Sequence, residues 1–243
     1  VADSVFVHVK EAELTGSVHE GLLDGINYRD DQTVTLVLYA PLKEDVFVLG
    51  DFNNWTPHAA SRMIKDGSRF WITLEDLSPG ESFGFQYLVD GELLIADPYT
   101  EMTLDPNDKW IDQNTYPGLK TYPEGLTTGI TSVLQPGKKP FTWNHTDFAA
   151  PDADKLVIYE LLVRDFLKAH DWATMTDTLG YLAGLGINAI ELMPVNEFEG
   201  NESWGYNPSF YFAADKYYGP ADDLKIFIDS CHGRGIAVII DMV

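Results

Sequence analysis

Between residues 33 and 95 hydrophobic and polar positions alternate, which is the pattern of half-buried β-strands. The runs 34–38, 46–49, 70–74 and 83–89 are short and are separated by turn residues. Asp90-Gly91 follows the last of these runs and is the pair that a type I′ hairpin turn requires. Strands of this length, at spacings of about 8–12 residues, predict a β-sandwich.

A different pattern begins after Lys155. Continuous apolar runs, which are typical of strands buried in a parallel sheet, alternate with helical periodicity. The expected order is strand 156–159, helix 175–185, strand 187–193, helix 224–231 and strand 236–240. Gly186 and Gly235 follow the two helices, where a C′ residue is expected. Residues 155–243 therefore predict a β-α-β-α-β unit of parallel α/β architecture.

These patterns divide the chain into four parts. They are an N-terminal extension over 1–29, a β-sandwich over 30–98, a connecting segment over 99–154 and the α/β region over 155–243. Residues 96–154 carry seven prolines and no sustained periodicity. Because proline interrupts both helices and strand pairing, we expect the connecting segment to be ordered mainly by its aromatic side chains.

Charge narrows the classes of partner. The chain has 16 Lys+Arg against 38 Asp+Glu and a net charge of -22, so nucleic acid and anionic membrane surfaces are poor partners. No run approaches the ~18 apolar residues of a membrane span, and no signal peptide is visible, so the localisation stays unknown. The single cysteine, Cys231, excludes an internal disulfide framework and a Cys-rich zinc site.

The loop after the second expected strand carries the candidate chemistry. In parallel α/β proteins ligands gather at the carboxyl ends of the strands. This loop, from Met193 to Leu224, mixes aromatic rings with amides and carboxylates. A sugar fits such a set, because its C–H faces stack on rings and its hydroxyls hydrogen-bond to polar groups. The alternative is that the rings pack in the core. We favour packing for three of the rings and leave the choice between packing and sugar binding open for two. Packing is expected for Phe210, Phe212 and Tyr218, and the open rings are Trp204 and Tyr206.

Four segments of the α/β region occur together and in order. They are KLVIYELLVRDF, INAIELMPVNEFEG, SWGYNPSFYFAADKYYG and GIAVIIDMV. Together they resemble the opening of the catalytic domain of the α-amylase family, glycoside hydrolase family 13. The resemblance implies that residues 155–243 are the first three strands of a truncated (β/α)8 TIM barrel. It also implies that Tyr206 stacks on the sugar at the cleavage subsite, with Trp204 on the same loop, and that Asp241 supports the charge network around the nucleophile.

The upstream region has a resemblance of its own. VFVLGDFNNWTP and FWITLEDLSPGESFGFQYLVDG resemble the isoamylase-type N-terminal module, a family 48 carbohydrate-binding module with an immunoglobulin-like fold of the early set type. In glucan-binding members one tryptophan matches Trp55, a lysine falls at Gln86, and a second tryptophan falls at Leu93 or Leu94. Because two of these three groups are absent, a structural role is favoured, with Trp55 as the candidate glucan contact.

The resemblance implies a retaining glycosidase or transglycosylase that acts on the α-1,4 or α-1,6 linkages of starch- or glycogen-type α-glucans. Its two catalytic carboxylates would follow strands four and five, so we expect none in this chain and no activity from the chain alone. The family's usual calcium ligand would also lie beyond Val243, so we expect no metal ligand and no cofactor here. Four acidic residues near the strands match no catalytic position. They are Glu160, Asp165, Glu191 and Glu197.

Two other functions stay open. The chain could be a glucan-binding module, which Trp55 and the aromatic loop favour and Gln86 disfavours. It could also have a structural role, because the open edge of a three-stranded parallel sheet predicts a homodimer through strand 236–240. Amylases, debranching enzymes and branching enzymes share these opening motifs, so the sequence does not choose among them.

Overall fold

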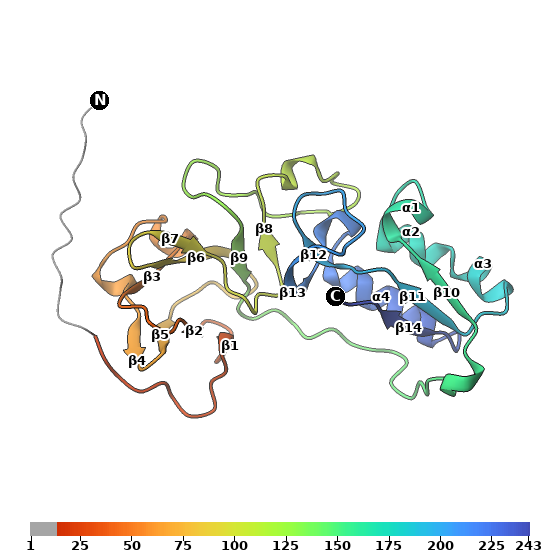
Figure 1. Ribbon diagram of the computed structural model, residues 1–243, viewed down its shortest axis with the longest axis horizontal. Helices are drawn as coiled ribbons and strands as arrows, with labels where there is room; N and C mark the ends of the chain where they lie inside the picture. The colour runs from red at the N-terminus through yellow and green to blue at the C-terminus, as the bar shows by residue number, and fades with distance from the viewer. Residues whose placement is uncertain (1–13) are drawn as a thin grey trace.

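The computed structural model describes residues 14–243, and Figure 1 shows antiparallel sheets toward the N-terminus and a helix-covered parallel sheet toward the C-terminus. The expected extension over residues 1–29 lies partly outside the described residues, and its last part forms β1 (Gly25–Tyr28). No helix within residues 14–243 is long and apolar enough to cross a membrane.

Two antiparallel sheets form the first region. One has the order β1-β2-β5-β4, where β2 is Val34–Tyr39, β4 is Ile64–Asp66 and β5 is Arg69–Leu74. The other has the order β3-β6-β9-β8, with β7 also on β6. Its strands are β3 (Val46–Gly50), β6 (Phe83–Val89), β7 (Leu93–Ile95), β8 (Thr103–Leu104) and β9 (Thr131–Leu134). Short 3-10 turns follow β3, at Asp51–Asn53 and Ala59–Ser61.

The core of this region lies between the two sheets. Leu36 from β2 packs in one buried cluster with Phe85 and Tyr87 from β6, and all three are fully buried. The strands predicted from alternation are therefore confirmed, and the sheets pack face to face as a sandwich. The hairpin prediction is also confirmed, because Asp90 (φ 52°) and Gly91 (φ 70°) both have the positive φ that the turn requires.

The proline-rich segment contributes to the sandwich as well as connecting it. β9 pairs with β6, and β8 pairs with β9, so the second sheet takes two strands from residues 99–154. β9 fits between Pro123 and Pro136, and four residues are too few to show a period. The second sheet therefore extends beyond residue 98.

The α/β region contains the expected unit of parallel strands and helices. β10 (Ile158–Leu161), β11 (Ala189–Leu192) and β14 (Ala237–Ile240) pair in parallel in that order. The helices are α1 (Val163–Phe166), α2 (Trp172–Asp177), α3 (Leu179–Gly184) and α4 (Ala221–His232). One helix was expected over 175–185, but it is interrupted at Thr178, whose hydroxyl donates to the Met175 carbonyl at 2.7 Å and competes with the helical ladder.

The long loop after β11 has structure of its own. β12 (Asn196–Phe198) and β13 (Pro208–Ala214) form an antiparallel hairpin, followed by the 3-10 turn η5 (Lys216–Tyr218). Another 3-10 turn, η3 (Asp108–Trp110), follows β8, and η4 (Ala153–Lys155) precedes β10. In Figure 1 this hairpin lies between β8 of the sandwich and the parallel sheet.

Candidate functional site

Two of the expected site residues meet at the carboxyl ends of the parallel strands. Asp241 directly follows β14, and its N–H donates to the Leu192 carbonyl at 3.0 Å. Tyr206 comes from the loop between β12 and β13, and its hydroxyl donates to Asp241 Oδ2 at 2.8 Å. The Tyr206 side chain remains 45% exposed, so it is accessible to a ligand. Sequence analysis assigned each residue a role but did not predict this contact.

A tight turn presents Tyr206. Gly205 has φ 89°, and a Cβ at this position would lie 2.1 Å from the Pro194 carbonyl oxygen, so only glycine fits. The Gly205 N–H donates to Ser203 Oγ at 2.9 Å, and Ser203 Oγ is hydrogen-bonded in turn to Asn207 Oδ1. The turn therefore fixes the backbone on both sides of Tyr206.

Acidic groups surround the Tyr206 hydroxyl. The hydrogen bond to Asp241 raises the pKa of Tyr206, and the nearby charges of Glu160 and Glu191 act in the same direction. Glu160 and Glu191 are register neighbours on β10 and β11. The phenol therefore stays protonated near neutral pH and acts as a hydrogen-bond donor at an acidic strand edge.

The other rings of the loop divide into exposed and buried ones. Trp204 is 60% exposed, close to Tyr206 in sequence, and Tyr218 is fully buried as expected. The packing expected for Phe212 is wrong, because this ring is 60% exposed and contacts the Tyr99 ring at a centroid distance of 5.6 Å. β13 is half of a hairpin outside the main sheet, and three of its side chains are exposed, those of Ser209, Tyr211 and Phe212. Phe210 is half-buried.

Trp55, the candidate glucan contact of the sandwich, is buried, with only 7% of the residue exposed. Its Nε1 donates to Asp51 Oδ1 at 3.1 Å, and Asp51 Oδ2 is 3.0 Å from Lys120 Nζ. A Cβ on Gly84 would lie 3.3 Å from the indole ring. This geometry favours packing for Trp55 over stacking on a sugar.

Gln86, at the position where the resemblance to the module implies a lysine, has a fully buried side chain. Its amide donates to the carbonyls of Thr128 (2.9 Å) and Ile130 (2.8 Å). Residues of the connecting segment therefore satisfy this group.

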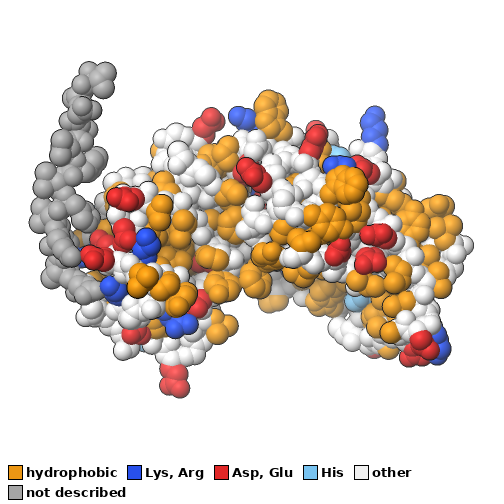
Figure 2. Space-filling model, viewed as in Figure 1, with side chains coloured by type: hydrophobic (Ala, Val, Ile, Leu, Met, Phe, Trp, Pro, Cys, Tyr) orange, Lys and Arg blue, Asp and Glu red, His pale blue; other side chains and the backbone are white. Residues whose placement is uncertain are grey.

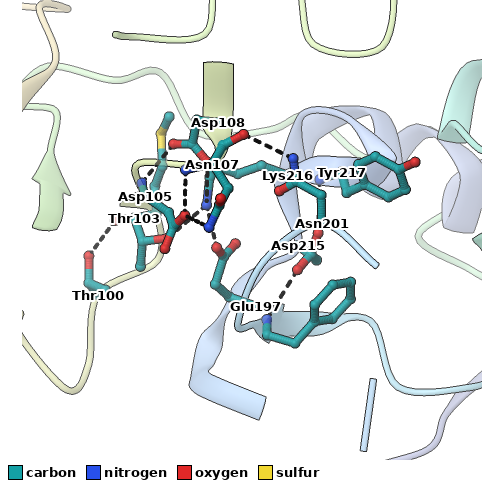
Figure 3. A network of polar contacts seen from close by, with 12 residues as sticks. Thr100, Thr103, Asp105, Asn107, Asp108, Glu197, Asn201, Asp215, Lys216 and Tyr217 are labelled. Atoms are coloured by element: carbon teal, nitrogen blue, oxygen red, sulfur yellow. Dashed lines mark hydrogen bonds and ion pairs between the residues drawn. The ribbon is translucent and has the colours of Figure 1, made fainter. Parts of the chain in front are cut away.

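A buried polar cluster lies at the base of the β12–β13 hairpin (Figure 3). Lys216 is 3% exposed, and its Nζ donates to Thr103 Oγ1 at 2.9 Å and to Glu197 Oε1, and lies 3.5 Å from Asp108 Oδ1. Asp215 accepts from the backbone N–H of Phe198 at 3.1 Å. Sequence reasoning missed this cluster. The available signal for the cluster was Lys216 itself, which stands between Asp215 and two tyrosines in a chain poor in cations.

The electrostatics of the cluster follow from its burial. Burial raises the pKa of Asp108 to about 6, against the opposing effect of Lys216. Burial, together with the charge of Glu197, also raises the pKa of Asp215. Burial alone would lower the pKa of Lys216, but the surrounding carboxylates outweigh it and raise that pKa, so the ammonium stays charged. Asp108 Oδ1 and Glu197 Oε2 accept no hydrogen bond from the described residues.

No group of three or more His, Cys, Asp or Glu side chains in residues 14–243 could hold a metal ion.

Comparison with known families agrees with both halves of this architecture. The profile of the α-amylase catalytic domain matches residues 140–243, and that of carbohydrate-binding module 48, the isoamylase N-terminal domain, matches residues 25–100. The chain belongs to the α-amylase family, with a module of family 48 ahead of its catalytic-domain region.

Several curated relatives are similar over most of the chain. The 1,4-alpha-glucan branching enzyme GlgB of Cupriavidus pinatubonensis is 31% identical over 225 residues, which cover 87% of this chain and 28% of the relative. A malto-oligosyltrehalose trehalohydrolase of Rhizobium sp. is 30% identical, over 80% of this chain and 32% of that protein. The chain thus spans about a third or less of these relatives.

Solved structures share the fold. The pullulanase SAP of group B Streptococcus, solved in complex with maltotetraose, superposes with a TM-score of 0.69 at 20% identity, over 92% of this chain and 33% of that one. At this identity the likeness speaks for the fold alone.

Proposed function

We propose that the chain is the substrate-binding edge and N-terminal module of an enzyme that hydrolyses or transfers α-glucans by a retaining mechanism. The hydrogen bond between Tyr206 and Asp241, beside the exposed Trp204, carries this proposal. This hydrogen bond is consistent with a Tyr206 ring that contacts a sugar while Asp241, at the end of β14, holds the Tyr206 hydroxyl. A neutral sugar also avoids the repulsion that a net charge of -22 would exert on an anion.

We also propose a finer architecture for the two regions. The sandwich is an immunoglobulin-like module of the early set type, and β10, β11 and β14 are the first three strands of a (β/α)8 barrel. The parallel strand order β10-β11-β14 and the helices between the strands support the second assignment.

Kinetics of an active protein that contains this chain test the function. Tyr206→Ala should lower kcat/KM because it removes the stacking ring. The expected loss of transition-state stabilisation is about 1–3 kcal/mol. Phe212→Ala is the matched control, since Phe212 is a similarly exposed ring on the adjacent strand. Equal losses from the two substitutions would contradict the assignment of Tyr206.

The chain alone should not cleave starch, glycogen or pullulan. None of Glu160, Asp165, Glu191 and Glu197 matches a catalytic position of the family, and binding surface cannot replace the missing carboxylate pair. The assay is release of reducing sugar by the purified 243-residue chain. Activity that persists through further purification would contradict this expectation.

A homodimer is a second candidate, which the open sheet edges favour. Among the described residues β10 and β14 are the edge strands of the parallel sheet, and Ile158 (46%) and Ile240 (41%) are exposed on them. Edge strands of this kind pair with other chains. Sedimentation of the chain tests the candidate.

A further inference from the structure

We propose that Lys216 is a positioning residue for the sugar-binding loop, and that it acts by fastening the base of the β12–β13 hairpin to the sandwich. This inference rests on the proposed function. It assigns a role in catalysis to a buried lysine, and to Thr103 and Asp108, that touch no substrate themselves.

Lys216 lies at the base of the hairpin that carries the sugar-binding loop. Glu197 is on β12, and Lys216 directly follows β13 and Asp215, so their ion pair joins the two ends of one hairpin. Trp204 and Tyr206 lie in the connection between those two strands. The pair therefore closes the base of the hairpin whose tip carries both candidate sugar contacts.

Lys216 also attaches the hairpin to the sandwich. Thr103, which accepts a hydrogen bond from Lys216, is on β8, the edge strand of the second sandwich sheet. Asp108 lies in the turn η3 after that strand, and its Oδ2 accepts from the backbone N–H of Asp105 at 2.8 Å. The loop itself makes a further contact, because Asn201 Nδ2 donates to the Asn107 carbonyl at 3.0 Å. Figure 3 shows these groups converging from the two regions.

Lys216 is also the positive charge that compensates the buried carboxylates. One ammonium faces Glu197 and Asp108 in a site from which water is excluded, and Asp215 lies beside it. Without that cation the carboxylates would be left buried and uncompensated, which is strongly unfavourable. The elements that carry them would therefore move apart so that water could solvate the carboxylates. Since those elements are β12, η3 and η5, their separation would displace the hairpin that presents Tyr206.

Exchange and kinetics test the proposal together. In an active protein that contains this chain, Lys216→Met should lower kcat/KM at least tenfold, while Lys216→Arg, which keeps the cation in a bulkier side chain, should lose less than Lys216→Met. In the 243-residue chain, Lys216→Met should speed amide hydrogen exchange at residues 199–207. Lys225→Met is the matched control, because Lys225 pairs with Asp222 on the surface of α4 and should change neither readout.

A milder variant keeps the test decisive if Lys216→Met does not fold. Thr103→Val preserves the shape of the side chain and removes only the hydroxyl that Lys216 Nζ contacts. It should speed exchange at residues 199–207 and lower kcat/KM about threefold. If a folded Lys216→Met, or Thr103→Val in its place, keeps the parent's kcat/KM and loop exchange, the positioning role is overturned.

The outcomes separate this inference from the function beneath it. Loss of activity in Tyr206→Ala with none in Lys216→Met overturns only the positioning role. No loss in Tyr206→Ala overturns the proposed function itself, whatever Lys216→Met does.

Discussion

Two aromatic motifs in this chain resemble sugar-binding motifs, but the rings of one are exposed and the ring of the other is buried. The tryptophan of the sandwich, Trp55, is 7% exposed and has its N–H engaged by Asp51, whereas Trp204 and Tyr206 of the hairpin loop are 60% and 45% exposed. Figure 2 shows hydrophobic side chains extending across the middle of the visible face, between the two regions. A sequence motif therefore identifies which aromatic residue is present, but the packing of neighbouring segments determines whether a ligand can reach its ring.

The neighbours that cause the difference are identifiable. On the sandwich, Lys120 pairs with Asp51, and Thr128 and Ile130 accept from Gln86, so the connecting segment occupies this surface. The hairpin loop is held at its base and turn instead, which leaves its rings open.

The largest expected effect is on stability, and it should separate the two tryptophans. Trp55→Ala should lower the free energy of unfolding by about 3–5 kcal/mol, the usual cost of deleting a buried large aromatic side chain. Trp204→Ala should change it by less than about 0.5 kcal/mol, because that side chain is mostly exposed. Denaturant titration of the chain measures both. Similar losses would show that the two rings are equally part of the structure.

The next effect concerns the buried cluster that joins the regions. The pKa of Asp108 is raised from 3.8 to about 6, so the folded state holds this proton more tightly than the unfolded state. Stability present below about pH 4 should therefore be lost as the pH rises to about 6, by up to about 3 kcal/mol from this group. Asp108→Asn removes the titration, so its unfolding free energy should depend less on pH over this window. Parallel profiles for both proteins would contradict the shift.

Glycine substitutions give a smaller contrast between the loop and the sandwich. Gly205→Ala should cost about 2 kcal/mol or more, because it adds a clash with the Pro194 carbonyl to the strain of positive φ. Gly91→Ala, in the β6–β7 turn, should cost about 1 kcal/mol, since its φ is also positive but nothing lies within 4 Å of the added Cβ. Thermal unfolding of the two variants checks the order.

A single hydroxyl should have a still smaller effect on the loop. Tyr206→Phe keeps the ring and removes only the hydrogen bond to Asp241, which is exposed to water. In an active protein containing this chain, kcat/KM should fall less than for Tyr206→Ala. The expected loss of transition-state stabilisation is about 0.5–1.5 kcal/mol. A loss as large as that of Tyr206→Ala would assign the role to the hydroxyl.

Much of the fold was predictable because its signals are local. Period-two alternation marked the strands of the sandwich, and glycine followed the helices before β11 and β14. β8 and β9 escaped because two and four residues carry no period, and they are held by pairing with strands distant in sequence.

The site was predictable only in part, for the same reason. Tyr206 and Asp241 were identified one by one from motifs, but their contact joins residues 35 positions apart. In the buried cluster Thr103 contacts Lys216, which lies 113 positions away, and local pattern does not report such a contact. The exposure of Phe212 depends on an uncovered hairpin face, which is again a tertiary property.

The smallest expected effect is on self-association, and it contrasts the sheet edges of the two regions. The sandwich edge β8 is two residues long and is covered by the Lys216 cluster, whereas β10 and β14 carry the exposed Ile158 and Ile240. We therefore expect weak dimers through the parallel sheet, opposed by the repulsion of a net charge of -22 on each chain. Salt screens that repulsion, since the Debye length falls from about 30 Å at 0.01 M to about 10 Å at 0.1 M. Sedimentation at these two ionic strengths should show more dimer at the higher one, and Ile240→Lys should reduce it. A monomer under both conditions, with slow amide exchange along residues 236–243, would instead show that the edge is protected within a single chain.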